Sequence, residues 1–389
     1  MRLASLLLTC ILSFTCITVL ATDRIIKPKI APGYEPVDPL TEKGLWMELE
    51  DYELAIQRSA LLVKDETLNQ YVRTAACRVA GDYCNDLRIY IMRNPNFNAS
   101  MTANGVMLVW TGLLVRVSSE DQLAAVLGHE LAHYTQLHTL TRIRQIKKSM
   151  TAGSILDIGI ILATGIPLPV GQFSAIASAM SFSRGQEEEA DLLGASFMAQ
   201  SGYNPHAAAQ VWEMVVQEEE SAIIKSKEPG MFSQTHPNSA DRIVTLKTYV
   251  ADTYPQNNIQ AQDRSSHVEM LNHYYTTLME DQLNTNRFGR TQNILKKHIE
   301  IGVEPGLIHF FQGEMYRQRN TDGDINLAKK SYKLAVQGNK PVADAYRNLG
   351  YINLKQGDPS QASEEFRRYL ELKPDADDRA MIEFYLQEP

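Results

Sequence analysis

The sequence lacks an excess of positive charge. Its 46 acidic side chains outnumber its 38 basic ones, and the formal net charge is −8 over 389 residues. Proteins that bind nucleic acid draw much of their affinity from basic side chains that contact phosphates. The acidic balance therefore argues against nucleic acid as a partner.

Cysteine is also scarce, with four residues in the chain. Neither Cys10 nor Cys16 lies in a convincing lipoprotein cleavage context. Cys77 and Cys84 are seven residues apart, and in an exported chain they could form a disulfide around Gly81. Two buried thiols are the alternative, and the sequence leaves both open.

Long apolar runs are missing after the first 21 residues. The segment 153–181 is apolar, but Asp157, Pro167 and Pro169 interrupt it. Its longest run is too short to cross about 30 Å of hydrocarbon. A packed core hairpin is one interpretation, and a loop that covers a cleft or makes peripheral membrane contact is the other.

Residues 1–21 do contain an apolar run, with Arg2 before it and Ala21 followed by Thr22 at its end. This pattern predicts a secretory signal peptide that is cleaved near Ala21/Thr22. An uncleaved membrane anchor is the alternative, because the run is close to spanning length.

The most informative motif is His-Glu-Leu-Ala-His at 129–133. Ser119 and the acidic residues after it predict a helix start, and an apolar stripe through Leu131 predicts that the helix is buried. Two histidines four residues apart share one face and can hold one Zn²⁺, while Glu130 can take a proton from the water that zinc activates. A surface helix with two incidental histidines is the alternative.

A catalytic zinc site needs a third protein ligand. The segment 183–191 predicts a second helix start, in which Glu187 and Asp191 are one turn apart and share a face. Glu187 can bind the metal, and Asp191 can accept a hydrogen bond from a ligand histidine. Glu188 and Glu189 point elsewhere. The alternative is an acidic first turn that the helix dipole favours.

Together the two segments resemble the CAAX protease and HtpX family of zinc peptidases. Three further stretches resemble this family's layout: Asn98-Ala99 with the edge strand and turn after it (Gly105–Leu114), Thr235–Pro237, and Arg242. The resemblance covers roughly residues 45 to 250.

The resemblance implies a mainly α, gluzincin-like metallopeptidase domain with a small β-sheet. It further implies one zinc ion per chain, whose ligands are His129, His133 and Glu187, with Glu130 as the general base. For the remaining site residues we predict that Asp191 orients a ligand histidine and that Arg242 or His236 stabilises the oxyanion. The strand at 107–110 is expected to pair with an extended substrate by β-augmentation.

His236 also has a second predicted role. The segment 230–239 has the composition of a mobile loop. A neutral imidazole from this loop could fill the fourth zinc position and hold the enzyme latent. A plain loop histidine, fixed by Pro237, is the alternative.

The last third of the chain has the spacing of an α-helical tetratricopeptide-repeat (TPR) solenoid. One copy carries Ala345, Leu349, Gly350, Ala362, Phe366 and Pro374, and a weaker copy carries Gly313, Tyr316, Ala328, Tyr332 and Ala335. Residues 267–300 could hold a third, degenerate pair. Such repeats stack into a peptide-binding surface, and a helical spacer without a ligand is the alternative.

The predicted order is signal peptide (1–21), zinc metallopeptidase domain (22–260) and repeat domain (267–389). It resembles exported, repeat-bearing members of the family. This implies a periplasmic endopeptidase with chaperone activity, whose substrates are unfolded or stalled outer-membrane proteins and whose repeats contact the outer-membrane assembly machinery. A non-proteolytic TPR chaperone or assembly factor with a structural or latent zinc site is the alternative.

Overall fold

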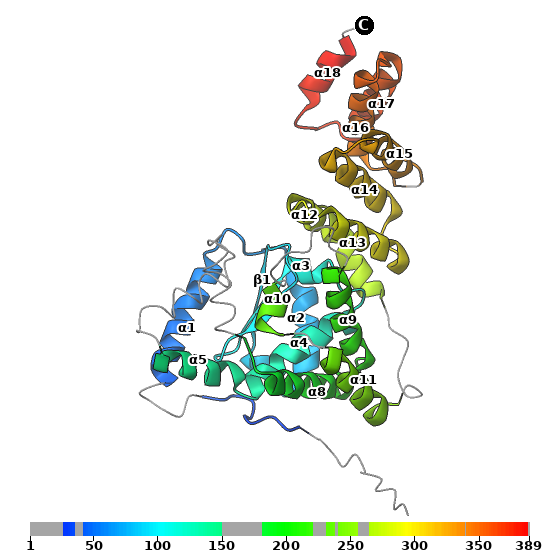
Figure 1. Ribbon diagram of the computed structural model, residues 1–389. Helices are drawn as coiled ribbons and strands as arrows, with labels where there is room; N and C mark the ends of the chain where they lie inside the picture. The colour runs from blue at the N-terminus through cyan, green and yellow to red at the C-terminus, as the bar shows by residue number, and fades with distance from the viewer. Residues whose placement is uncertain are drawn as a thin grey trace, which may run out of the picture.

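The computed structural model describes residues 26–35, 42–149, 181–220, 231–237, 240–255, 264–338 and 340–387. Helices dominate these ranges and surround one small sheet (Figure 1). The predicted signal peptide and almost all of the apolar segment 153–181 lie outside the described residues. Within those ranges, no helix combines the length and the apolar character that crossing a membrane requires.

The sheet has three strands, β1 (Arg88–Met92), β2 (Ala99–Met101) and β3 (Val106–Trp110), in the order β1-β3-β2. The central strand β3 runs parallel to β1 and antiparallel to β2. The prediction that residues 107–110 offer a free edge to a substrate is therefore wrong. All five residues of β3 are buried, as expected of a strand that is covered on both faces and paired along both edges.

In the part of the chain that the structure describes before residue 260, ten helical elements accompany this sheet. They are α1 (Glu42–Gln57), α2 (Glu66–Ala80), the 3-10 helix η1 (Gly81–Asp86), α3 (Thr111–Leu114), α4 (Glu120–Thr135), α5 (His138–Ser149), α8 (Arg184–Gln200), α9 (His206–Glu220), α10 (Met231–Thr235) and α11 (Ala240–Thr253). Helix α4 begins as predicted, because the Ser119 side chain accepts a hydrogen bond from the Gln122 amide. It packs against α2, α8, α9 and β2, and so lies at the centre of the fold.

Glycines allow α4 and α8 to cross closely. A Cβ atom on Gly194 of α8 would lie 3.0 Å from the backbone nitrogen of His129, and one on Gly128 of α4 would lie 3.2 Å from the Gly194 carbonyl oxygen. Any larger side chain at Gly194 would meet backbone atoms, which cannot turn away as a side chain can. This crossing places the two predicted metal-binding segments against each other.

Cys77 at the end of α2 and Cys84 in η1 form a disulfide. The disulfide closes the turn between these two elements, where Gly81 has a positive φ of 55°. Of the two interpretations that the sequence left open, the structure therefore has the disulfide.

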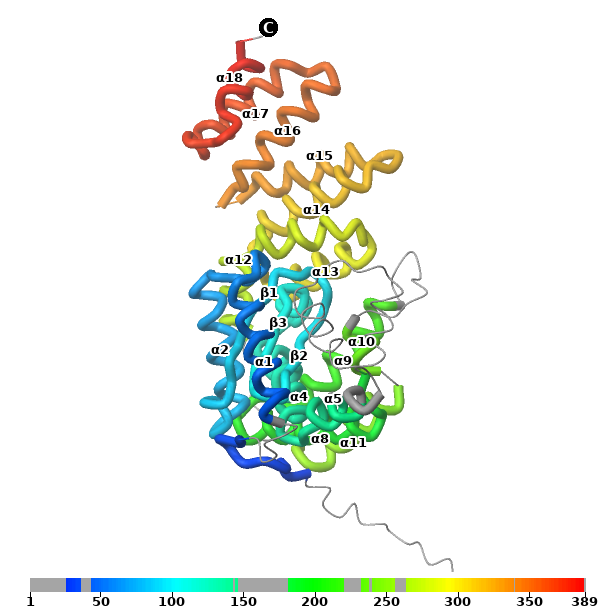
Figure 2. Tube along the Cα trace, turned by 90° about the vertical axis from the view of Figure 1, so that its left-hand side faces the viewer, coloured from blue at the N-terminus to red at the C-terminus, as the bar shows by residue number. Residues whose placement is uncertain are grey.

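The C-terminal region is entirely helical in the ranges that the structure describes. It comprises α12 (Ser265–Asn284), α13 (Phe288–Ile301), α14 (Pro305–Arg319), α15 (Asp324–Ala335), α16 (Ala343–Lys355), α17 (Pro359–Leu372) and α18 (Arg379–Gln387). The later helices extend away from the sheet-containing body (Figures 1 and 2). Helix α14 packs on α15, and α16 packs on α17.

Equivalent glycine–aromatic contacts hold these two pairs together. A Cβ atom on Gly313 would lie 2.4 Å from the Tyr332 ring, and one on Gly350 would lie 2.4 Å from the Phe366 ring. Both contacts join positions that the sequence pattern selects. The helical architecture is confirmed, whereas assignment of these pairs to the tetratricopeptide class remains a prediction.

The first C-terminal helices share a core with the peptidase body. One continuous apolar cluster runs from Ile30 to Met315 and includes residues of α12, α13 and α14. Polar contacts reinforce this boundary: His267 bonds to the Val117 carbonyl, His298 to the Val115 carbonyl, and Arg116 to Gln282. The predicted division between residues 260 and 267 remains untested, and we propose that α12 and α13 fold together with the peptidase domain.

Candidate metal centre

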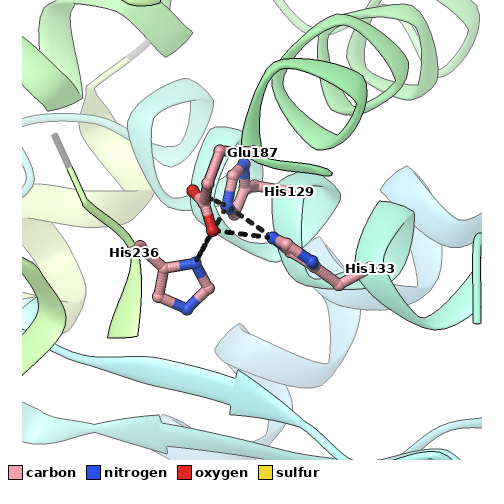
Figure 3. Close-up of side chains that lie close together, drawn as sticks. All are labelled: His129, His133, Glu187 and His236. Atoms are coloured by element: carbon pink, nitrogen blue, oxygen red, sulfur yellow. Dashed lines mark hydrogen bonds and ion pairs between the residues drawn. The ribbon is translucent and has the colours of Figure 1, made fainter. Parts of the chain in front are cut away.

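Four buried side chains converge beside the crossing of α4 and α8 (Figure 3). His129 and His133 come from α4, Glu187 from the first turn of α8, and His236 from the residue directly after α10. Among the described residues, this is the one group of metal-ligating side chains that could hold an ion, and its donor atoms all lie within 4.8 Å of one another. All three predicted ligands and the predicted fourth donor thus meet in one place.

The spacing of the donor atoms fits a tetrahedral ion. The Nε2 atoms of His129 and His133 are 3.1 Å apart, and Glu187 carboxylate oxygens lie 3.6 Å from each of them. Zinc–nitrogen bonds of 2.0–2.1 Å in a tetrahedron separate the ligand atoms by about 3.3 Å. Lone pairs of two rings and a carboxylate that converge in this way repel one another unless a cation or protons lie between them. The donor set and its geometry therefore fit zinc.

His236 completes the set through its Nδ1 atom. This atom lies 3.1 Å from Glu187 Oε1 and 3.3 Å from His129 Nε2. The imidazole stacks on Phe232 of α10 with ring centroids 4.5 Å apart. The sequence predicted a mobile loop over 230–239, but residues 231–235 form α10, and His236 is 2 % exposed.

Glu130 lies beside the four donors. It is buried, and its Oε1 atom is 3.5 Å from His236 Nε2. Burial raises the pKa of this carboxyl group, while the neighbouring His236 and His129 oppose the rise. A carboxyl group whose pKa is shifted upward is closer to the range that a general base needs at neutral pH.

His129 is supported from behind by Asp191. Its Nδ1 atom lies 3.0 Å from Asp191 Oδ1, which also accepts a hydrogen bond from the Trp212 indole. Burial lowers the pKa of His129, but Asp191 and Glu187 outweigh it and raise the value to about 9. Asp191 thus lies where the sequence predicted a residue that orients a ligand histidine.

Arg242 also lies behind the ligands. Its Nε and Nη2 atoms donate to both carboxylate oxygens of Asp191, and its Nη1 atom donates to the Pro237 carbonyl and lies 2.7 Å from Glu187 Oε2. Burial opposes the charge on both groups, but each stabilises the charge of the other. Burial lowers the pKa of Arg242, but Asp191 and Glu187 outweigh it and raise the value. Burial raises the pKa of Asp191, but Arg242 and His129 outweigh it and lower the value. The predicted oxyanion role of Arg242 finds no support in this position, because its donors face protein acceptors.

His133 has a different support, which the sequence reading missed. Its Nδ1 atom lies 3.1 Å from His138 Nδ1, and His138 Nε2 lies 3.0 Å from Glu189 Oε2. Burial and the charge of His129 hold the pKa of His133 well below its usual value, so this ring is neutral, the form that binds zinc. The sequence predicted that Glu189 points away from the metal centre. Its carboxylate contacts His138 and none of the predicted metal ligands. A histidine five residues after His133 was the available signal.

Comparison with known proteins gives two kinds of match. Residues 63–250 match the family model described as Peptidase family M48. The chain is 26% identical to the beta-barrel assembly-enhancing protease of Escherichia coli (strain K12) over 52% of its own length and 43% of that protein. It is 27% identical to the protein of the same name from Yersinia pestis, over 54% of its own length and 45% of that protein.

A mitochondrial metalloendopeptidase OMA1 from Schizosaccharomyces pombe is 30% identical over 42% of the chain and 47% of the relative. The chain thus spans less than half the length of each of these relatives. All of these proteins carry the name of a protease or a metalloendopeptidase.

Proposed function

Because residues 63–250 match the family model described as Peptidase family M48, we propose that the chain carries a zinc metallopeptidase domain and is a periplasmic endopeptidase that acts on misfolded or stalled outer-membrane proteins. The convergence of two histidines, Glu187 and the buried Glu130 in this domain carries the proteolytic part of the proposal. Two relatives are named beta-barrel assembly-enhancing protease, and this name supports the proposed class of substrate. The signal peptide predicted at residues 1–21 supports the compartment.

In the proposed reaction, each side chain has one task. Zinc held by His129, His133 and Glu187 would polarise the scissile carbonyl and acidify the attacking water. Glu130 accepts the proton of that water and returns it to the leaving amine. Asp191 holds the Nδ1 proton of His129, which fixes the tautomer that presents Nε2 to the metal.

An extended substrate would pair with β2 rather than with β3. Strand β2 is bonded to β3 along one edge and packs on α4, which carries both ligand histidines. The Asn98 side-chain oxygen, directly before β2, is buried and accepts no hydrogen bond from the described residues. A substrate backbone amide could donate to it, and pairing through backbone atoms suits unfolded chains of varied sequence.

We further propose that His236 holds the site latent. Its Nδ1 atom takes the place of a fourth donor, and its Nε2 atom faces Glu130. In this position the imidazole would exclude the attacking water and cover the general base. Release of His236 would then be a condition for cleavage.

The presence of His236 as a fourth donor also favours one alternative function. A site with four protein donors resembles a structural zinc site, which is closed, more than a catalytic one, which keeps a position open. The chain would then be a non-proteolytic chaperone or assembly factor, whose C-terminal helices bind partners of the outer-membrane assembly machinery.

A substrate trap tests the main proposal. Glu130→Gln keeps the size of the side chain but removes the general base, so it should bind substrates without cleaving them. After crosslinking in the periplasm, we expect the variant to retain more unfolded outer-membrane proteins than the wild type. Capture of other classes of protein instead would contradict the proposed substrate. If assembly of outer-membrane proteins is rescued equally by both forms, the chaperone alternative gains support.

The latch is tested separately with His236→Ala. The proposal predicts faster basal proteolysis and unchanged zinc content, because three ligands remain. A fall in turnover at unchanged substrate affinity would assign His236 to oxyanion stabilisation instead. No change in either quantity would remove His236 from the mechanism.

A further inference from the structure

His133, His138 and Glu189 form a chain of contacts that leads from the metal centre to the protein surface. We infer that His138 is a positioning residue that fixes the tautomer and orientation of His133, and that Glu189 in turn fixes His138. This inference rests on the proposed role of His133 as a ligand. Its basis is the pair of contacts between the three side chains, 3.1 Å and 3.0 Å long.

Only one arrangement of protons satisfies these contacts when His133 binds through Nε2. The Nδ1 atom of His133 then carries its proton and donates it to His138 Nδ1. This makes His138 Nδ1 an acceptor, so the single N–H proton of a neutral His138 ring resides on Nε2 and is donated to Glu189. Each nitrogen has one partner, and both rings stay neutral, as metal binding requires.

The turn between α4 and α5 brings the His138 ring next to the His133 ring. Helix α4 ends at Thr135 and α5 begins at His138. Between them, Leu137 has a φ of 56°, a left-handed conformation that is unfavourable for a residue with a branched side chain. This tight reversal returns the chain so that the two imidazole rings meet with centroids 5.1 Å apart.

His138 is buried and bonded, unlike a solvated residue at the start of a helix. His138 is 3 % exposed, and both of its ring nitrogens face partners. Glu189, which is the outermost of the three contacting side chains, is more exposed than His138. Its side chain is 29% exposed, and its Oε1 atom lies 3.6 Å from Lys29 Nζ. The two ligand histidines are thus supported unequally, with a buried carboxylate directly behind His129 and a second imidazole between His133 and its carboxylate.

The test measures zinc affinity by competition with a chelator in the full-length mature protein. His138→Leu removes the acceptor and should weaken zinc binding roughly tenfold or more, because loss of such a supporting group costs about 10- to 100-fold. His138→Asn places an amide oxygen near the former Nδ1 and should restore most of the affinity. Glu189→Gln should have a smaller effect than His138→Leu.

Glu188→Gln is the matched control, because it removes the adjacent negative charge on the same helix turn without touching His138. Its affinity should equal that of the wild type. Cobalt-substituted protein gives a second readout: the visible absorption bands should shift in His138→Leu and return toward the wild-type positions in His138→Asn. The melting temperature of the metal-free protein shows whether His138→Leu has damaged the fold as a whole.

Equal affinities for His138→Leu and wild type, or equal losses for His138→Leu and His138→Asn, would overturn the inference. If His138→Leu does not fold, the comparison of Glu189→Gln with Glu188→Gln still decides, since equal affinities for these two would also overturn it. His133→Ala shows separately whether His133 is a zinc ligand, on which the inference about His138 depends. Retention of zinc in His133→Ala would refute the proposed site itself.

Discussion

The crossing of α4 and α8 and the helix pairs α14–α17 are stabilised in contrasting ways. At the crossing, glycines bring two helices together, and buried polar groups from α8, α9 and α11 surround the histidines of α4. In the helix pairs, the same glycine–aromatic contact recurs between neighbouring helices, and apolar clusters lie between successive helices. The metal centre therefore depends on groups that are distant in sequence, whereas each glycine–aromatic contact joins two helices that follow each other in the chain.

The largest effect should follow from Gly194→Val. The new side chain meets the backbone of α4 at His129, so the helices must separate. We expect a loss of about 3 kcal/mol in unfolding free energy, together with loss of tight zinc binding. Chemical denaturation and zinc analysis measure the two quantities.

Gly185→Val on the same helix is the control, because a Cβ atom there meets nothing within 4 Å. It should change stability by less than about 0.5 kcal/mol. Similar losses in the two variants would mean that the crossing does not depend on close approach.

Acid should weaken the contact between the C-terminal helices and the peptidase body. Burial lowers the pKa of His267 to about 3 and that of His298 to about 4. Both folded-state pKa values lie below the unfolded value of about 6.5. The stability that these two neutral histidines contribute to the folded state is therefore fully present above pH 6.5 and is lost as the pH falls below it. Each histidine should contribute a loss of about 2 kcal/mol between pH 7 and pH 5.

The measurement compares wild type with the double variant His267→Gln/His298→Gln, in which amides can replace the imidazole hydrogen bonds but do not titrate. The unfolding free energy of the variant should fall less between pH 7 and pH 5. Subtraction cancels groups that titrate in both proteins, the histidines of the metal centre included. Parallel curves would contradict the assignment of buried, neutral histidines at this boundary.

A smaller and local effect should follow from Gly350→Ala in α16. The added methyl group meets the Phe366 ring, and the cost is partly offset by the higher helix propensity of alanine. We expect a net loss of about 1–2 kcal/mol, with unchanged zinc content. In combination with Phe366→Leu, which clears the space, Gly350→Ala should cost less than it does alone. A loss of zinc in Gly350→Ala would break the contrast between the two regions.

The sequence predicted those features that short-range spacing encodes. The ligand pair of α4, Glu130, and the Glu187–Asp191 turn of α8 each lie within one or two helix turns, and the structure brings them together. The same holds for the glycines and aromatic residues of the helix pairs.

Features that depend on tertiary contacts were predicted less well. Nothing near Trp212 in the sequence indicates that its indole donates to Asp191, and Arg242 could not be placed behind the ligands rather than in front of them. The position of β3 could have been recognised, however. Its uninterrupted apolar run, Val106–Trp110, is typical of a central strand rather than an edge strand.

Turnover at matched zinc content tests the central claim most directly. Wild type and Glu130→Gln are each loaded with one zinc per chain, and cleavage of an unfolded protein is measured under the same conditions. If Glu130 is the general base of a zinc peptidase, the variant keeps its zinc and loses cleavage by at least about 100-fold. Equal cleavage by both proteins at equal zinc content would contradict the account.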